Sequence, residues 1–210
     1  MNDRLVIYFS QTKHTEKIAN LIGQACKTSP FPLQVTAPYS SKDLDWTLPN
    51  SRANQEMENL AARPDLKPLN LDLTGKPKIF LGYLLWWSQA PRAINTFLDT
   101  YDLSGYKLYL FCTSGSSSID KSVRELSKTY PQLNIQAAHR FANDTTLAQI
   151  ETWLKSLWSK RNWNFVSKIP VSFVRINEQI DCCISQHKNH PGPSTDYDYQ
   201  FRQYFRAALR

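Results

Sequence analysis

Three short runs of the chain are apolar without interruption, and they constrain the fold more than any other feature. They occupy residues 5–9, 79–83 and 108–112. None alternates with polar residues, so each is predicted to be a strand that is buried on both faces. Amphipathic helical patterns separate them. Strands covered on both faces and alternating with helices are typical of an α/β protein with a doubly wound parallel sheet.

Weaker patterns complete this alternation. Two further strands are predicted at 33–37 and 134–137. The helices are predicted at 16–25, 54–63, 92–101, 119–130 and 145–158. The second helix should end before Pro64, because proline cannot continue a helix. The polar stretch 39–52 has the composition of an ordered loop.

Three loops leave the ends of the apolar strands, and each is rich in groups that bind ligands. Residues 10–15 offer hydroxyls and a cation, residues 84–91 contain Trp86 and Trp87, and residues 113–118 place small hydroxyl residues around a glycine. In a doubly wound sheet the ligand lies at the carboxyl ends of the strands. We therefore expect the three loops to form one site.

The first loop joins a buried strand to the start of a helix, which is a favourable place for an anion. Free backbone N–H groups and the positive end of the helix dipole meet there. Ser10, Thr12 and Thr15 add three hydroxyls in six residues, which suits a phosphate monoester. The loop has neither the GxGxxG nor the GxxxxGKS pattern. The alternative is that these hydroxyls only cap the helix.

In their amino-acid sequence as well as in their order, the loops resemble those of flavodoxin-like FMN-binding proteins. The segments that carry this resemblance are Tyr8–Thr15, Gly82–Pro91 and Phe111–Gly115, with Phe97–Asp99 and Asp102–Gly105 between the last two. The resemblance implies a five-stranded parallel sheet of order 2-1-3-4-5 with helices on both faces. It implies that residues 1–158 form the FMN-binding domain and that residues 159–210 are a C-terminal extension.

Three groups of site residues follow from the resemblance. The FMN phosphate is expected to contact the side chains of Ser10, Thr12 and Thr15 and the backbone of Gln11, Lys13 and His14. The isoalloxazine ring is expected to be flanked by Tyr83, Leu84, Leu85, Trp86 and Trp87. Its pyrimidine edge and the ribityl chain are expected to border Thr113, Ser114, Gly115 and Ser116. No residue is assigned a catalytic role, because the redox chemistry is that of the flavin.

The sequence departs from the usual pattern of such proteins at two places. Lys13 and His14 stand where Gly-Asn is usual, and Leu84 stands where proline is usual. If the turn requires a positive φ at Lys13, the lysine costs on the order of 1 kcal/mol. Pairing of its ammonium with a phosphate would offset that cost. Loss of FMN binding is the alternative.

The charge of the chain helps to choose among three functions. The formal net charge is +7 and the pI is near 9.2. Small flavodoxin carriers, in contrast, look acidic as a group and dock to their partners by opposite charge. The basic balance favours an NAD(P)H-dependent reductase of quinones or similar acceptors. A one-electron flavodoxin carrier and a non-catalytic interaction module that has lost FMN are the alternatives.

Several other functions are disfavoured. The basic residues are spread along the chain without a block of five, so no nucleic-acid partner is expected. No apolar run reaches membrane-spanning length, the first apolar run is too short for a signal peptide, and the four cysteines suggest no disulfide framework, so a cytoplasmic location is expected. No metal site is expected: Cys182 and Cys183 with His187 and His190 match no standard zinc spacing. Cys112 is expected to be a core residue rather than a redox thiol.

The last fifty residues lie outside the resemblance. A strand is predicted at 171–176, a polar link at 187–198 and an amphipathic helix at 199–209. Such an extension could cover the edge of the sheet, form a homodimer or dock a redox partner protein. The sequence does not choose among these.

Overall fold

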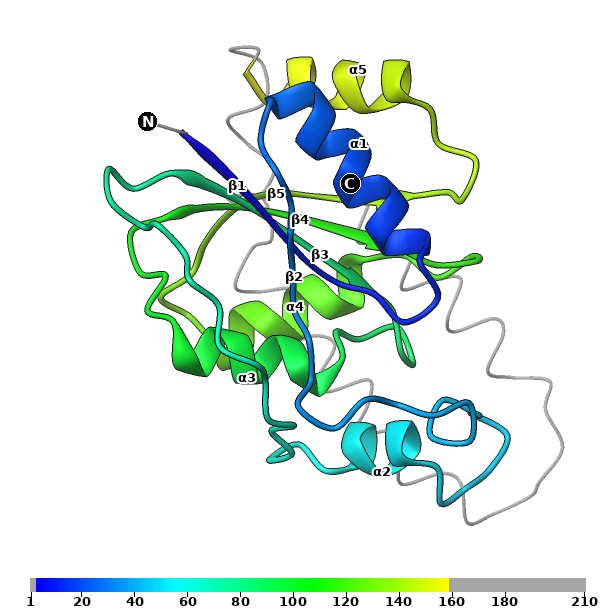
Figure 1. Ribbon diagram of the computed structural model, residues 1–210. Helices are drawn as coiled ribbons and strands as arrows, with labels where there is room; N and C mark the ends of the chain where they lie inside the picture. Colours follow the sequence, from blue (N-terminus) through cyan, green and yellow to red (C-terminus); the bar gives the residue numbers. More distant parts are fainter. Residues whose placement is uncertain (1–2, 159–210) are drawn as a thin grey trace, which may run out of the picture. The chain divides into compact units, whose positions relative to one another are not determined.

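Five parallel strands form one sheet at the centre of the computed structural model, which describes residues 3–158 (Figure 1). The strands are β1 (Arg4–Phe9), β2 (Phe31–Pro32), β3 (Lys78–Leu84), β4 (Lys107–Thr113) and β5 (Asn134–Phe141). Their order is β2-β1-β3-β4-β5, and every neighbouring pair is parallel. The predicted fold class and strand order are therefore confirmed.

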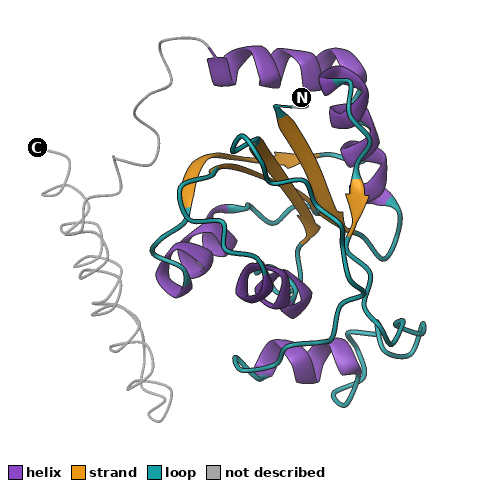
Figure 2. Ribbon diagram, turned by 60° about the vertical axis from the view of Figure 1, so that its left-hand side comes forward, coloured by secondary structure: helices purple, strands orange, loops and turns teal. Residues whose placement is uncertain are grey.

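Helices cover both faces of this sheet (Figures 1 and 2). They are α1 (His14–Cys26), α2 (Arg52–Glu58), α3 (Arg92–Thr100), α4 (Asp120–Thr129) and α5 (Leu147–Trp158). Helices α1 and α5 pack on one face and α3 and α4 on the other, while α2 lies beyond the sheet. Successive strand residues such as Phe80 and Leu81 enter opposite cores, because side chains alternate along a strand. This explains why β1, β3 and β4 are apolar over residues 5–9, 79–83 and 108–112.

The strand predicted at 33–37 is wrong in its position. The segment 31–37 pairs with β1 only through β2 (Phe31–Pro32) and through the Leu33 amide, which donates to the Tyr8 carbonyl. Leu33 and Val35 are buried, as the alternating pattern requires. Val35, however, forms an antiparallel bridge with Leu66. The alternation thus indicated an extended segment correctly, but its partner is a nearby loop.

The helix predicted at 54–63 is also wrong in its bounds, because α2 ends at Glu58, well before Pro64. Asn59 has an extended backbone, and its side chain accepts a hydrogen bond from the Ala61 amide. Such a local side-chain bond competes with the helix. The buried Arg92 guanidinium donates to two carbonyls in the last turn of α2 and holds that end of the helix.

The other predicted elements lie near their observed positions, with two adjustments. Strand β5 continues to Phe141, four residues beyond the prediction, and α5 begins at Leu147. In the part of the chain that the structure describes, no helix is long and apolar enough to cross a membrane. The strand, link and helix predicted after residue 158, and the Cys182–His190 group, lie outside the described residues.

Candidate functional site

The turn between β1 and α1 places four residues at the carboxyl end of β1. Its last residue, Lys13, is the N-cap of α1 and has a φ of 62°, so the positive φ considered from the sequence is present. The Lys13 side chain makes no capping hydrogen bond. The hydroxyl cap expected under the alternative interpretation is therefore not seen at this position. The first amides of α1 have no partner within the helix and are available to an anion.

The hydroxyls of this turn have different surroundings. Ser10 Oγ is buried and has no hydrogen-bond partner among the described residues. A buried hydroxyl without a partner costs about 1–3 kcal/mol, so such atoms usually mark a binding site or an ordered water. Thr12 is exposed. Thr15 is buried, and its Oγ1 lies 2.8 Å from Thr113 Oγ1. This bond connects the first loop to the third.

The second loop contains a tight hairpin. Trp86 and Gln89 exchange two backbone hydrogen bonds of 3.0 and 2.9 Å. Trp87 and Ser88 between them have φ values of 50° and 62°. Positive φ at both central residues defines a type I′ turn, which usually contains Asn-Gly. The hairpin continues the sheet, since the Leu85 amide donates to the Thr113 carbonyl.

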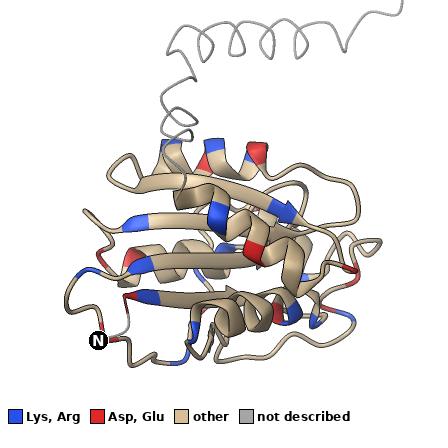
Figure 3. Cartoon of the chain, turned by 90° about the horizontal axis from the view of Figure 1, so that it is seen from above, with Lys and Arg blue, Asp and Glu red and all other residues tan. Residues whose placement is uncertain are grey.

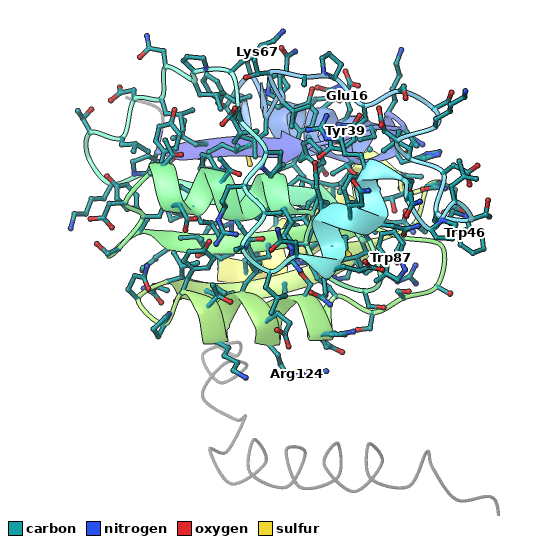
Figure 4. The ribbon with its side chains drawn as sticks, turned by 90° about the horizontal axis from the view of Figure 1, so that it is seen from below. Glu16, Tyr39, Trp46, Lys67, Trp87 and Arg124 are labelled. Carbon is teal, nitrogen blue, oxygen red and sulfur yellow. The ribbon has the colours of Figure 1, made fainter. Side chains whose placement is uncertain are left out.

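The two tryptophans of this hairpin point to different surroundings. The Trp86 ring packs edge-on against Phe9, at 6.2 Å between centroids, and against Tyr39, at 5.5 Å. Trp87 is 45% exposed. Figure 4 shows Trp87 and Tyr39 at the end of the sheet where α2 lies. Because Trp86 is committed to protein contacts, Trp87 is the tryptophan whose ring is free for a ligand.

The third loop follows β4 and is anchored at its base. Thr113 is buried, and the Ser114 hydroxyl donates to the Ser117 carbonyl. The Ser114 carbonyl accepts a hydrogen bond of 3.2 Å from the Arg140 guanidinium. Gly115 and Ser116 are exposed, and no described atom lies within 4 Å of the position that a Cβ of Gly115 would take. The backbone of this loop is therefore open to a flat ligand.

The other predicted site residues differ in how far their side chains are exposed. The Tyr83 side chain is fully buried, and its hydroxyl accepts a hydrogen bond from Ser122. Burial raises its pKa, so the phenol stays neutral. Leu84 and Leu85 are half-buried against the core. The remaining predicted residues of the first turn, Gln11 and His14, are half-buried and exposed, respectively. The three loops thus meet at one edge of the sheet, as the sequence predicts.

Cys112 is the last residue but one of β4, next to Thr113. It is fully buried, and burial raises the pKa of its thiol to about 12. The reactive thiolate is therefore scarce at neutral pH. This agrees with the prediction of a core residue.

Sequence reasoning missed a cluster that supports the second loop. Tyr39 lies against Trp86 and donates a hydrogen bond to the Glu56 carboxylate. Burial, with the Glu56 contact as a smaller cause, raises the pKa of Tyr39. Arg52 lies 4.1 Å from the centroid of the Tyr39 ring and pairs with Glu56 at 2.7 Å. The sequence signal was weak, because it consisted of an aromatic residue at the start of a polar stretch and an i,i+4 pair of opposite charges further along the chain.

Arg140 was missed for a simpler reason. The sequence predicts that this strand ends at residue 137, three residues before Arg140, and so does not place Arg140 at its carboxyl end. In the structure Cys112 and Arg140 are paired across β4 and β5, which brings Arg140 beside the third loop.

The fold and this edge define a flavodoxin-like protein, and the comparisons agree. Residues 3–157 match a family model described as flavodoxin. The chain therefore belongs to the flavodoxin family. A comparison with curated proteins gave no match.

Solved structures with the same fold come from several bacteria. A putative flavoprotein from Bacteroides eggerthii is 38% identical, with a TM-score of 0.70 over 75% of this chain and 98% of that chain. One from Bacteroides uniformis is 34% identical, with a TM-score of 0.69 over 72% and 97%. A flavoprotein from Lactobacillus acidophilus, solved in complex with FMN, is 20% identical, with a TM-score of 0.58 over 73% and 99%.

Proposed function

We propose that the chain binds FMN at the edge where the three loops meet and acts as an NAD(P)H-dependent reductase of quinones or similar acceptors. The observation that carries the FMN proposal is the buried Ser10 Oγ, which has no hydrogen-bond partner among the described residues and lies in the turn that leads into α1, whose first amides have no partner within the helix. A phosphate oxygen supplies the acceptor that this hydroxyl lacks. The Lactobacillus flavoprotein of the same fold was solved with FMN, which supports the choice of ligand.

Each loop has a distinct part in holding FMN. Ser10, Thr12 and the amides at the start of α1 contact the phosphate, and Lys13 supplies a positive charge. The hydrogen bond between the Thr15 and Thr113 hydroxyls holds the first and third loops together, and each hydroxyl can still form a further hydrogen bond to the ligand. Trp87 stacks on the ring, as aromatic rings favour. The backbone of residues 114–116 meets the pyrimidine edge.

FMN, when bound, supplies the electron-transfer chemistry, and the chain's residues bind and orient it. The choice of a reductase rests on charge. Basic and acidic residues both occur on α1 and α5, and the charged residues of the strands are all basic, so no single acidic field lies over these elements (Figure 3). A carrier that docks by opposite charge gains its on-rate from such a field. The net charge of +7 supports an enzyme that takes small molecules.

The first experiment tests the cofactor. The purified full chain should be yellow and release FMN on denaturation. Calorimetric titration of the apoprotein should show FMN binding well below a Kd of about 100 μM, roughly −5.5 kcal/mol, and much weaker FAD binding. Equal affinity for both flavins, or no binding of FMN, would contradict the proposal.

The second experiment tests the reaction. Anaerobic titration with NADH and with NADPH, followed at the flavin absorbance band, should bleach the bound FMN with at least one of them. A quinone added afterwards should restore the band. A protein that binds FMN and is bleached only by a reduced carrier protein would instead be an electron carrier.

A further inference from the structure

An arginine that lies outside the three loops is positioned to act on the ring. Arg140 occupies the carboxyl end of β5, opposite Cys112 of β4. Its Nη1 donates to the Ser114 carbonyl at 3.2 Å. The residue is half-buried. Its guanidinium therefore lies beside the loop that borders the pyrimidine edge in the proposed FMN site.

The charge of Arg140 has no carboxylate partner among residues 3–158. In the described part of the chain the other half-buried arginines, Arg4, Arg52 and Arg63, pair with Asp3, Glu56 and Asp99. Arg140 forms no ion pair there, and Ser114 accepts its one hydrogen bond. A partly desolvated, unpaired guanidinium keeps most of its charge effect on its surroundings. This distinguishes Arg140 from an arginine that is simply part of the surface.

The strand order separates this charge from the phosphate turn. Three strand spacings lie between β1 and β5, which is roughly 14 Å at about 4.8 Å each. In the proposed site, Lys13 and the α1 amides therefore lie at the phosphate end of the ligand, and Arg140 lies toward its ring end. The two positive charges are assigned to opposite ends of one molecule.

We propose, on the basis of the FMN binding proposed above, that Arg140 is a positioning residue that stabilises reduced FMN relative to oxidised FMN. The oxidised ring is neutral, and it takes up two electrons and one proton to give a reduced ring that carries a negative charge on its pyrimidine side. A positive charge near that side tunes the flavin toward the reduced form. Arg140 supplies that charge and holds the 113–118 loop through Ser114.

The alternative is that Arg140 only anchors the loop. Two substitutions separate these roles: Arg140→Lys keeps the charge and Arg140→Gln removes it. Arg124, on α4, is the matched control, because Arg124→Gln makes the same change in net charge at an exposed site away from Trp87 (Figure 4).

The test measures the two-electron midpoint potential of the full chain with FMN bound, by anaerobic titration with dithionite and a mediator dye. The Kd of oxidised FMN is measured in parallel. At an effective dielectric of about 20, two opposite unit charges about 10 Å apart attract each other enough to change a binding constant roughly tenfold. Arg140→Gln should therefore weaken binding of reduced FMN about tenfold relative to oxidised FMN. That ratio lowers the potential by about 30 mV for a two-electron couple.

The outcomes separate this proposal from the one on which it rests. Arg140→Lys and Arg124→Gln should keep the wild-type potential. If the wild type binds no FMN, the proposed function fails. If FMN binds but Arg140→Gln keeps the wild-type potential, or Arg140→Lys shifts it equally, Arg140 is only an anchor and the inference is overturned. Should Arg140→Gln not fold, salt that screens the charge must lower the wild-type potential, and a salt-independent potential overturns the inference.

Discussion

The turn between β1 and α1 and the hairpin after β3 lie at the same edge of the sheet, and both hold non-glycine residues at positive φ. Lys13 has a φ of 62°, and Trp87 and Ser88 have values of 50° and 62°. In the hairpin, contacts with other residues of the protein offset the free-energy cost of the positive φ values. Its flanking residues, Trp86 and Gln89, exchange two hydrogen bonds, and the Trp86 ring is packed against two aromatic neighbours.

The first turn has no comparable support from the described residues. Lys13 is exposed and makes no capping bond with its side chain. Ser10 Oγ is buried without a partner. Strained, unsatisfied backbone turns persist where they serve a ligand. Packing therefore sets the conformation of the hairpin, whereas we expect the first turn to gain its missing contacts when a ligand binds.

The largest expected effect tests the packing of the hairpin. Trp86→Ala should lower the free energy of unfolding of the apoprotein by about 2–4 kcal/mol, because it removes a large ring from two aromatic contacts. Trp87→Ala should change it by less than about 0.5 kcal/mol, since Trp87 is 45% exposed and its ring packs on neither Phe9 nor Tyr39. Urea unfolding of both variants measures the difference.

The same pair of variants tests the ring contact. Trp87→Ala should weaken FMN binding by about 1–3 kcal/mol through loss of stacking, measured by calorimetry. In the wild type, FMN binding should quench tryptophan emission. An unchanged FMN affinity in Trp87→Ala would show that the exposed tryptophan does not contact the flavin.

The sequence predicted best those elements whose partners are long, regular and apolar. Strands β1, β3 and β4 lie within two residues of their predicted bounds, because burial on both faces leaves a continuous apolar pattern. The segment between β2 and β3 was predicted worst. Val35 alternates correctly but pairs with Leu66, and α2 ends at a local bond of Asn59. Both outcomes depend on local partners that no periodicity reveals.

The site was predicted in its location more than in its detail. The loop order and the doubly wound pattern were enough to predict that residues 10–15, 84–91 and 113–118 lie at one edge of the sheet. Sequence adjacency did not show that Trp86 packs inward and Trp87 outward, because a type I′ turn at a Trp-Ser pair is unusual. Nor did it show that Tyr83 faces the core, where its hydroxyl meets Ser122.

The next effect tests the charge of the first turn. Lys13→Ala should weaken FMN binding by about 1.5–3 kcal/mol, roughly a tenfold to hundredfold rise in Kd, if its ammonium pairs with the phosphate. Riboflavin has no phosphate, and its affinity should stay almost unchanged. Titration of both flavins at low and high salt measures this, because salt screens an exposed pair. An equal loss for both flavins would place Lys13 away from the phosphate.

Ser10 gives a test in which stability and binding change in opposite directions. Ser10→Ala removes a buried hydroxyl that has no partner, so the apoprotein should be as stable as the wild type or more stable by about 1 kcal/mol. FMN binding should weaken by about 1 kcal/mol, since the phosphate loses a donor. Thermal unfolding without and with FMN measures both. A destabilised apoprotein would mean that the hydroxyl has a structural partner in solution.

The smallest effect separates strain from charge at Lys13. Lys13→Gly relieves the positive φ and should raise the free energy of unfolding of the apoprotein by about 0.5 kcal/mol, while Lys13→Ala keeps the strain. Both variants lose the ammonium and should lose FMN affinity equally. Lys27, at the C-cap of α1 with a φ of 55°, is the matched control. Lys27→Gly should gain similar stability and keep its FMN affinity. If Lys13→Gly instead binds FMN more tightly than the wild type, relief of strain outweighs the charge, and the lysine is a solvated turn residue.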